Sequence, residues 1–239
     1  MSKLNFKNEG DDLYISIDDT PFRSLLELKG LDLLLQKKIL EILADKFVFM
    51  NRLVLRPYDF RLPKYLLKSL PMTEVTFFGG TFNPIHEGHM ACLRLCPSDH
   101  IIILPDRNPH KELRNFNPLD EFIDLVQLFK DGPYSIYPGF WAKETPNPTS
   151  DWFNKVLIKK RNLLMGDDSF IGLKTWGQFE NILKGMSTLY VAPRKHSEEK
   201  LQQCASEYKN IHPDLAIVFL SDHEFKHLSS TEIRKNRFL

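Results

Sequence analysis

Short apolar segments alternate with segments of helical periodicity from Thr73 onward, and this alternation limits the fold more than any other feature. The segments that we predict as strands are residues 75–78, 101–104, 163–165, 188–192 and 216–220. The helices predicted between them are residues 119–129, 152–160, 179–183 and 198–208. Strands that alternate with helices pair in parallel through right-handed crossovers. The pattern therefore predicts an α/β fold, with a doubly wound parallel sheet and helices on both faces.

Residues 1–72 have a different pattern. Residues 13–17 alternate weakly and predict a short strand, whereas residues 31–47 carry apolar side chains at helical spacing. A further short helix is predicted after Pro63, because proline suits the first helical turn. We interpret residues 1–72 as a mainly helical N-terminal extension of unknown role, and residues 73–239 as the main domain.

Composition narrows the classes of function. The net charge is +1, with 32 basic and 31 acidic residues, which argues against a surface dedicated to nucleic acid. The three cysteines form no metal-binding array, so reduced thiols in or near a core are the favoured interpretation. No apolar run approaches the ~18 residues that a membrane span needs, and the first residues lack the apolar segment of a signal peptide. We expect a cytoplasmic protein that binds neither nucleic acid nor membrane.

The stretch from Phe77 to His89 carries the strongest chemical signal. A β-branched and aromatic run stops at Gly79 and Gly80, and His86 and His89 precede a helical run. This order predicts a strand, a tight turn and a helix N-terminus, where free N–H groups and the helix dipole attract anions. The two histidines lack a third metal ligand. We therefore predict that they donate hydrogen bonds to a polyphosphate.

Three further polar clusters follow predicted strands, at the edge where doubly wound sheets bind ligands. They are Pro109-His110-Lys111, Gly166-Asp167-Asp168 with Trp176, and Ser229-Ser230-Thr231-Glu232-Ile233-Arg234. Each has a simpler explanation: a solvated loop for the first, a core tryptophan in the second, and helix capping for the third. The functional alternatives are phosphate binding by the first and third clusters, and ribose and ring binding by the second.

In this order the clusters resemble the motifs of a nucleotidyltransferase superfamily with the signature Gly-Thr-Phe-x-Pro-x-His-x-Gly-His, and within it those of bacterial nicotinate-nucleotide adenylyltransferases. The signature is matched from Gly79 to His89, the Pro-His-Lys motif at 109–111, the Gly-x-Asp motif at 166–168 with Trp176, and the Ser-Ser-Thr-x-Ile-Arg motif at 229–234. The first and last motifs mark the superfamily, and the middle two favour its pyridine-nucleotide branch. The resemblance covers about residues 73–234 and implies a Rossmann-like sheet.

The resemblance implies transfer of the adenylyl group of ATP to nicotinate mononucleotide, which gives nicotinate adenine dinucleotide and pyrophosphate in NAD biosynthesis. The phosphate of the mononucleotide is itself the nucleophile, so no nucleophilic side chain is needed. Mg²⁺ is the implied cofactor, held mainly by the phosphates and not by a protein metal site. Catalysis of this kind rests on positioning and on stabilisation of charge.

Roles for individual residues follow from the same resemblance. The implied catalytic residues are His86, His89 and Arg234, with His89 nearest the reacting phosphorus. The residues implied to bind ATP and its phosphates are Gly80, Thr81, Phe82, His110, Lys111, Gly166, Asp168, Ser230 and Thr231. Thr149 and Trp176 are implied to bind the mononucleotide, with Trp176 stacked on the pyridine ring. Arg194, just past a predicted strand, is a further phosphate candidate.

The chain departs from the family pattern in several places. Pro148 stands where relatives usually have tyrosine, and Asp120 and Glu121 stand where a basic residue is common. Residues 1–72 are extra to the usual enzyme, and relatives commonly continue into another helix beyond the position of Leu239. None of these departures removes an implied catalytic group, so we expect an active enzyme.

Two alternative functions stay open. One is a sister enzyme that acts on nicotinamide mononucleotide or on another phosphorylated acceptor, such as phosphopantetheine; Thr149 and Trp176 argue for a pyridine ring. The other is a non-catalytic nucleotide-binding module that uses residues 1–72 as an interaction surface. His86, His89 and Arg234 argue against that module. A homo-oligomer is also left open.

Overall fold

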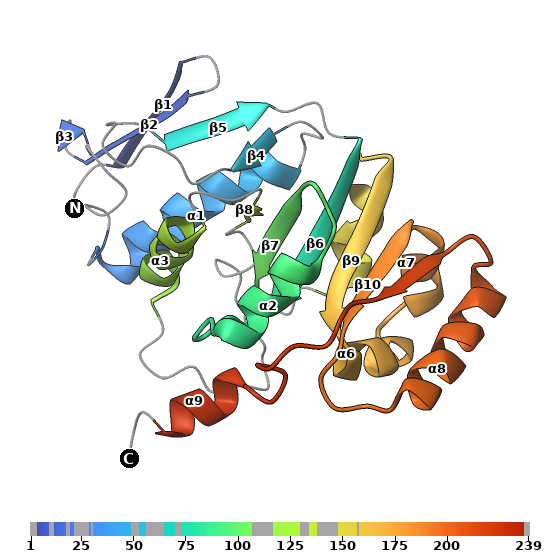
Figure 1. Ribbon diagram of the computed structural model, residues 1–239. Coiled ribbons are helices and arrows are strands. Elements are labelled where there is room, and N and C mark those ends of the chain that lie inside the picture. The colour runs from blue at the N-terminus through green and yellow to red at the C-terminus, as the bar shows by residue number, and fades with distance from the viewer. Residues whose placement is uncertain are drawn as a thin grey trace. The chain divides into compact units, whose positions relative to one another are not determined.

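The computed structural model describes residues 4–9, 12–17, 20–21, 29, 31–48, 53–55, 65–69, 73–106, 117–129, 134–137, 148–156 and 158–236. The chain divides into two compact units. One comprises residues 1–72 and 102–146, and the other comprises residues 73–101 and 147–239. Figure 1 labels the helices and strands of both units.

A parallel sheet forms the centre of the second unit. Its strands are β6 (Glu74–Gly80), β9 (Lys160–Gly166), β10 (Thr188–Ala192) and β11 (Ala216–Phe219), in the order β11-β10-β9-β6. Phe77 of β6 pairs with Leu163 of β9, and Leu163 pairs in turn with Leu189 of β10. All of these pairings are parallel, so the carboxyl ends of the strands meet at one edge of the sheet.

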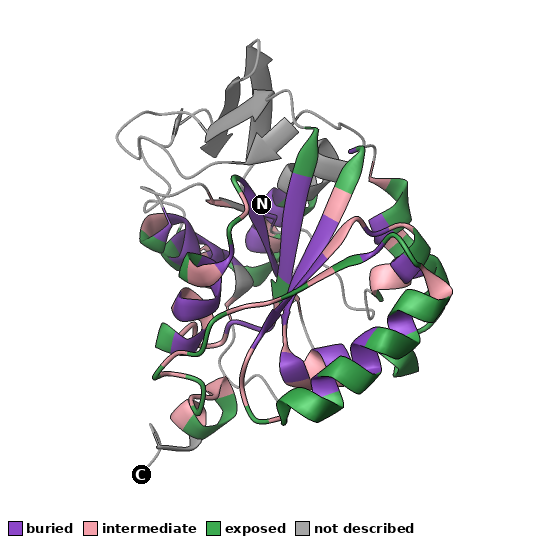
Figure 2. Ribbon diagram, turned by 45° about the vertical axis from the view of Figure 1, so that its right-hand side comes forward, coloured by how far each residue is buried: buried purple, intermediate pink, exposed green. Residues whose placement is uncertain are grey.

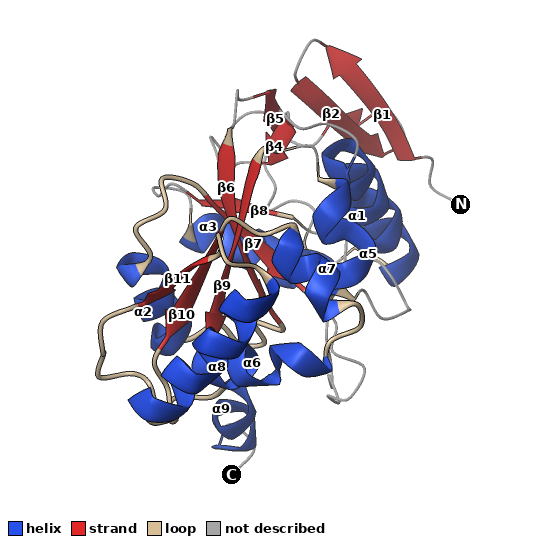
Figure 3. Ribbon diagram, turned by 90° about the vertical axis from the view of Figure 1, so that its right-hand side faces the viewer, coloured by secondary structure: helices blue, strands red, loops and turns tan. Residues whose placement is uncertain are grey.

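Helices lie on both sides of these strands. The helices that follow them are α2 (Glu87–Leu95), α6 (Asp167–Gly172), α7 (Phe179–Lys184) and α8 (Glu198–Ile211). Figures 1 and 3 show α6, α7 and α8 on one side of the strands and α2 on the other. The shorter elements are α5 (Thr149–Trp152), the 3₁₀ helices η2 (Phe153–Lys155) and η3 (Leu173–Thr175), and α9 (Ser230–Asn236). The predicted doubly wound, Rossmann-like sheet is confirmed.

The core of this unit follows the sequence pattern. Strands β6, β9 and β10 are buried over most of their length (Figure 2), because helices cover them on both sides, whereas β11 is partly exposed. Helix α8 buries the apolar stripe Leu201, Cys204, Ala205 and Tyr208, at helical spacing. The hydroxyl of Tyr208 donates to the carbonyl of Phe170 (2.8 Å), so this buried polar group is satisfied. Cys92, Cys96 and Cys204 are free and buried, as predicted for reduced thiols.

The first unit contains an antiparallel sheet with helices and two further strands. The sheet follows the path β1-β2-β5-β4, and β3 pairs with β2. Its strands are β1 (Leu4–Glu9), β2 (Asp12–Ile17), β3 (Thr20–Pro21), β4 (Leu53–Leu55) and β5 (Tyr65–Ser69). The remaining elements are α1 (Leu33–Val48), β7 (Ile101–Pro105), α3 (Pro118–Leu128) and β8 (Tyr134–Ile136). Helix α1 contacts α3, and the predicted strand at 101–104 is buried throughout.

Three expectations need correction. The described part of residues 1–72 holds five strands and one helix, so the extension is mixed and not mainly helical. The helix predicted after Pro63 is wrong, because Tyr65–Ser69 pairs with β2 and β4 as a strand. The helix predicted over 152–160 ends at Lys155. The guanidinium of Arg161 binds the carbonyls of Val156 and Ile158 and holds that segment in a non-helical form. No helix of the described residues is both long and apolar enough to span a membrane.

Candidate active site

The glycine turn at the end of β6 is shaped by the ring of Phe82. Phe82 has a φ of 47°, in the left-handed region that non-glycine residues rarely adopt, and its side chain is buried. The ring packs against Phe78 (5.2 Å between centroids) and His89 (5.1 Å). A Cβ atom on Gly80 would lie 3.0 Å from this ring, so glycine is needed for the close approach.

His86 and His89 cap the N-terminus of α2. The N–H of Gly88 donates to Nδ1 of His86 (3.1 Å), and the N–H of His86 donates to Nδ1 of His89 (3.3 Å). The rings are stacked, with centroids 3.8 Å apart and planes inclined by 31°. Because each Nδ1 accepts a hydrogen bond, a neutral ring at either position carries its proton on Nε2. The fold therefore selects the tautomer that can donate from Nε2.

The environment of His86 keeps its imidazole neutral. Burial, and then the positive charge of Arg194, lower the pKa of His86 to about 4, although Glu87 acts in the opposite direction. At neutral pH the ring is thus a hydrogen-bond donor and not a fixed cation. A polyanion bound beside it would favour the protonated ring and raise this pKa.

The last predicted motif contacts the first. The hydroxyl of Ser230 donates to the carbonyl of Pro84 (2.9 Å), and Nη1 of Arg234 donates to the carbonyl of Asn83. Nη2 of Arg234 donates to the hydroxyl of Thr231 (3.3 Å). Helix α9 is therefore fastened to the turn before the two histidines. The predicted capping is also present, since the N–H of Glu232 bonds to the hydroxyl of Ser229 (3.2 Å).

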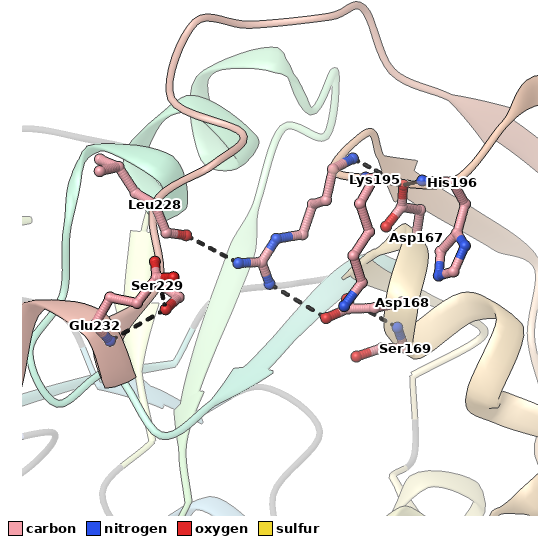
Figure 4. A network of polar contacts seen from close by, with 9 residues as sticks. Asp167, Asp168, Ser169, Lys195, His196, Leu228, Ser229 and Glu232 are labelled. Atoms are coloured by element: carbon pink, nitrogen blue, oxygen red, sulfur yellow. Dashed lines mark hydrogen bonds and ion pairs between the residues drawn. The ribbon is translucent and has the colours of Figure 1, made fainter.

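Arg194 links the Gly-x-Asp segment to the residues before α9. Its Nη1 lies 3.5 Å from Oδ2 of Asp168, and its Nη2 donates to the carbonyl of Leu228 (2.9 Å). Figure 4 shows the carboxylate and the carbonyl on opposite sides of the same guanidinium. A Cβ atom on Gly166 would lie 2.8 Å from Cδ of Arg194 and from Oδ1 of Asp168, so this glycine makes room for both side chains.

Asp167 is a residue whose role the sequence did not reveal. Its side chain is fully buried, and Oδ2 accepts the N–H groups of Arg194 (2.8 Å), Lys195 (2.8 Å) and His196 (2.9 Å) (Figure 4). Oδ1 has no hydrogen-bond partner among the described residues. In the sequence, Asp167 is an acidic residue next to a glycine at the end of a predicted strand. This pattern does not indicate that its carboxylate binds the backbone of residues 194–196. The carboxylate fixes the backbone from which Arg194 extends.

Thr149 and Trp176, the predicted mononucleotide ligands, lie on neighbouring segments. Thr149 begins α5 and Trp176 follows η3 directly, and both side chains are half-buried. The hydroxyl of Ser150 lies 3.9 Å from a Cβ atom built on Gly177, which brings the two segments together. Trp152 at the end of α5 packs edge-on against Phe77 of β6 (5.2 Å between centroids), which connects α5 to the central strand.

His110 and Lys111, two of the predicted phosphate ligands, lie outside the described residues. Within the described ranges, no group of three or more His, Cys, Asp and Glu side chains is arranged to hold a metal ion. The side chains of the candidate site supply imidazole and guanidinium donors, and the Asp168 carboxylate lies beside the guanidinium of Arg194.

Comparison with known proteins gives consistent results. Three relatives named "Probable nicotinate-nucleotide adenylyltransferase" come from Caldicellulosiruptor bescii (27% identity, 68% of this chain and 85% of the relative), Thermotoga maritima (26%, 68% and 80%) and Yersinia pestis (26%, 72% and 87%). The resemblance drawn from the motifs is thus confirmed. The family described as Cytidylyltransferase-like matches residues 77–236, well over half of the sequence. The chain therefore belongs to the cytidylyltransferase-like family and is a nucleotidyltransferase.

Proposed function

We propose that the protein transfers the adenylyl group of ATP to nicotinate mononucleotide, giving nicotinate adenine dinucleotide and pyrophosphate as a step of NAD biosynthesis. The observation that carries this proposal is the reciprocal cap of His86 and His89, which leaves the proton of each ring on Nε2 at a helix N-terminus. The names of the relatives support the choice of acceptor.

The reaction needs no nucleophile from the protein. A phosphate oxygen of the mononucleotide attacks the α-phosphorus of ATP, and the bond from that phosphorus to the bridging oxygen of the β-phosphate breaks as pyrophosphate leaves. The protein then has to align the two phosphates and stabilise the negative charge that spreads over their oxygens. Nε2–H donors on His86 and His89 are suited to this work, because hydrogen bonds to ionised phosphates are stronger than those between neutral groups.

The triphosphate would extend between α2 and α9. The backbone of Gly80, Thr81 and Phe82 forms the turn beside the histidines, and Arg234 and Ser230 hold the Asn83–Pro84 carbonyls. In this arrangement Ser230 and Arg234 position the turn as well as offering donors to phosphate. Thr231, His110 and Lys111 complete the proposed phosphate ligands.

Adenosine and the pyridine ring would occupy separate places. We assign Gly166 and Asp168 to adenosine, because the Asp168 carboxylate at the end of β9 can accept ribose hydroxyls. Thr149 and Trp176 are assigned to the mononucleotide, with the indole stacked on the pyridine ring. The approach of Ser150 to Gly177 supports a shared location for these two segments.

Magnesium would reach the site with ATP. Mg²⁺ prefers oxygen ligands and is commonly bound by substrate phosphates with one or two carboxylates. The nitrogen donors, with Asp168 as the carboxylate beside the guanidinium of Arg194, fit an ion carried by the phosphates rather than one held by a protein cage. When bound, the ion neutralises part of the phosphate charge.

The test is a panel of acceptors with ATP and Mg²⁺. The products are separated by chromatography, and pyrophosphate release is followed in parallel. We expect dinucleotide formation with nicotinate mononucleotide, and a much higher KM for that acceptor, but not for ATP, in Trp176→Ala. The exposed Lys184, which pairs with Glu180 on α7, supplies a control variant, Lys184→Ala. Turnover of phosphopantetheine but not of the mononucleotide would refute the substrate assignment.

A further inference from the structure

The guanidinium of Arg194 holds together two parts of the site. Nη2 donates to the carbonyl of Leu228 at 2.9 Å, and Nη1 lies 3.5 Å from the Asp168 carboxylate. The other oxygen of Asp168 accepts the N–H of Ser169 (2.9 Å). Both oxygens of this carboxylate therefore already have a partner, and a ribose diol that bound both of them would compete with the guanidinium for Oδ2.

Of the two partners, the guanidinium is the one free to move. The N–H of Ser169 belongs to the first turn of α6, whereas the side chain of Arg194 is flexible and about a third exposed. Ion pairs of this exposure are weak. The backbone at Arg194 is by contrast fixed by the buried Asp167 carboxylate, so the side chain can change partners while its anchor stays in place.

The region of the histidine pair lies within electrostatic range of Arg194. The positive charge of this guanidinium is one cause of the lowered pKa of His86. Guanidinium groups bind phosphates through paired hydrogen bonds, and a triphosphate carries more charge than a single carboxylate. A polyphosphate beside His86 is thus a stronger partner for Arg194 than Asp168 is.

We propose that Arg194 is a specificity-determining residue that couples recognition of the ATP phosphates to recognition of adenosine. Without phosphate, the guanidinium of Arg194 stays paired with the Asp168 carboxylate. When the β- and γ-phosphates bind, Arg194 moves to them and the freed Asp168 oxygen accepts a ribose hydroxyl. This inference rests on the proposed function, because it takes Asp168 as the adenosine ligand.

Such coupling has a definite consequence for partial ligands. Pyrophosphate should strengthen the binding of adenosine, and by linkage adenosine should strengthen the binding of pyrophosphate by the same factor. Adenosine alone should bind weakly, since it competes with Arg194 for the Asp168 carboxylate without offering the guanidinium a new partner. The site would thereby discriminate against nucleosides that lack phosphates.

Calorimetric titration of adenosine, with and without inorganic pyrophosphate and Mg²⁺, tests the proposal. In the wild type we expect pyrophosphate to raise the affinity for adenosine about two- to fivefold, as the release of one exposed ion pair allows. In Arg194→Ala, adenosine alone should bind more tightly than it does to the wild type by a similar factor, pyrophosphate should have no further effect, and ATP should bind more weakly. Arg194→Lys keeps the charge but cannot bridge Leu228 and Asp168, so it should also bind adenosine more tightly.

Several results would overturn the proposal. One is that Arg194→Ala binds adenosine more weakly than the wild type does. Another is that pyrophosphate raises the affinity of this variant for adenosine as much as it does in the wild type. A third is that the variant binds no adenosine although the wild type binds ATP. Thermal unfolding of both Arg194 variants, with Lys184→Ala as the control, establishes that the fold is intact. Failure of the proposed function is distinguishable from failure of this coupling. If the proposed function is wrong, the wild type forms no dinucleotide, whether or not pyrophosphate changes its affinity for adenosine.

Discussion

The rings of His86 and His89 both accept backbone hydrogen bonds at the start of α2: Nδ1 of His86 accepts the N–H of Gly88, and Nδ1 of His89 accepts the N–H of His86. One nitrogen of each ring is thus used to form the helix N-terminus, and the other carries the proton. The histidines of this motif consequently have two separable functions, a capping function at Nδ1 and a donor function at Nε2. Substitutions by asparagine can divide them, because the asparagine oxygen can take the place of Nδ1 while nothing replaces Nε2.

We predict that His89→Asn keeps the fold and loses activity. The amide oxygen of asparagine can accept the N–H of His86, so the cap and the thermal stability should be retained. The Nε2 donor is lost, and removal of one donor to a developing charge lowers kcat by about 10²- to 10³-fold. Thermal unfolding and steady-state pyrophosphate release measure the two effects separately. His89→Ala, which loses both functions, should be inactive and also less stable. A His89→Asn variant with wild-type kcat would contradict the assigned role.

The pKa of His86 predicts a pH dependence of stability. Burial and Arg194 lower this pKa to about 4 from the ordinary value of 6.5. Between these two pH values the unfolded chain binds more protons than the native protein, so the contribution is complete above pH 6.5 and is lost as the pH falls toward 4. His223, whose pKa is also lowered mainly by burial, acts in the same direction.

Urea unfolding at several pH values between 4 and 7 measures this dependence. The free energy of unfolding of His86→Asn should fall less steeply with decreasing pH than that of the wild type, because asparagine binds no proton. The amide should preserve the cap of α2, so the two proteins are comparable above pH 6.5. Parallel curves for the two proteins over this range would show that His86 is not the group responsible.

The sequence predicts the sheet of the second unit well, because its strands and helices are defined by local patterns. The apolar run at 163–165 and the helix at 198–208 are examples, and both are present, the first within strand β9 and the second as helix α8. The helix predicted over 152–160 is longer than the observed one. The carbonyls of Val156 and Ile158 bind Arg161, and local periodicity does not encode this contact. The strand at Tyr65–Ser69 likewise depends on pairing with distant partners.

The candidate site could be predicted as a set of motifs but not as a set of contacts. The histidine cap is local and could be expected from a helix start. The bonds from Ser230 to Pro84 and from Arg234 to Asn83 join residues 146 and 151 positions apart. The contact of Arg194 with Leu228 has the same long-range character. These contacts are set by the order of the parallel strands, which brings the ends of distant segments to one edge.

Gly166→Ala should disturb the site more than the fold. A Cβ atom there would lie 2.8 Å from side-chain atoms of both Arg194 and Asp168, and these side chains can move aside at little cost in stability. Their displacement should raise KM for ATP about tenfold or more, since small misplacements of binding groups weaken catalysis strongly. Gly172→Ala is the matched control, because nothing lies within 4 Å of its Cβ position. An unchanged KM for ATP in Gly166→Ala would argue against the assignment of Asp168 and Arg194 to the ATP site.

Asp167 should contribute to stability and to the position of Arg194 at once. Its buried oxygen accepts three backbone N–H groups, and Asp167→Ala would leave these donors without their acceptor. We expect a loss of about 3 kcal/mol in the free energy of unfolding by urea. Asp167→Asn keeps one acceptor oxygen but places its amide nitrogen where Oδ1 has no partner among the described residues. Its stability should therefore fall between those of the wild type and the alanine variant.

Because the segment that carries Arg194 is loosened, Asp167→Asn should also raise KM for ATP while leaving KM for the mononucleotide unchanged. Asp168→Asn, at a half-exposed carboxylate one residue away, is the control for stability and should unfold at nearly the wild-type urea concentration. Equal stabilities for Asp167→Ala and Asp168→Asn would show that the buried carboxylate does not hold the 194–196 backbone in solution.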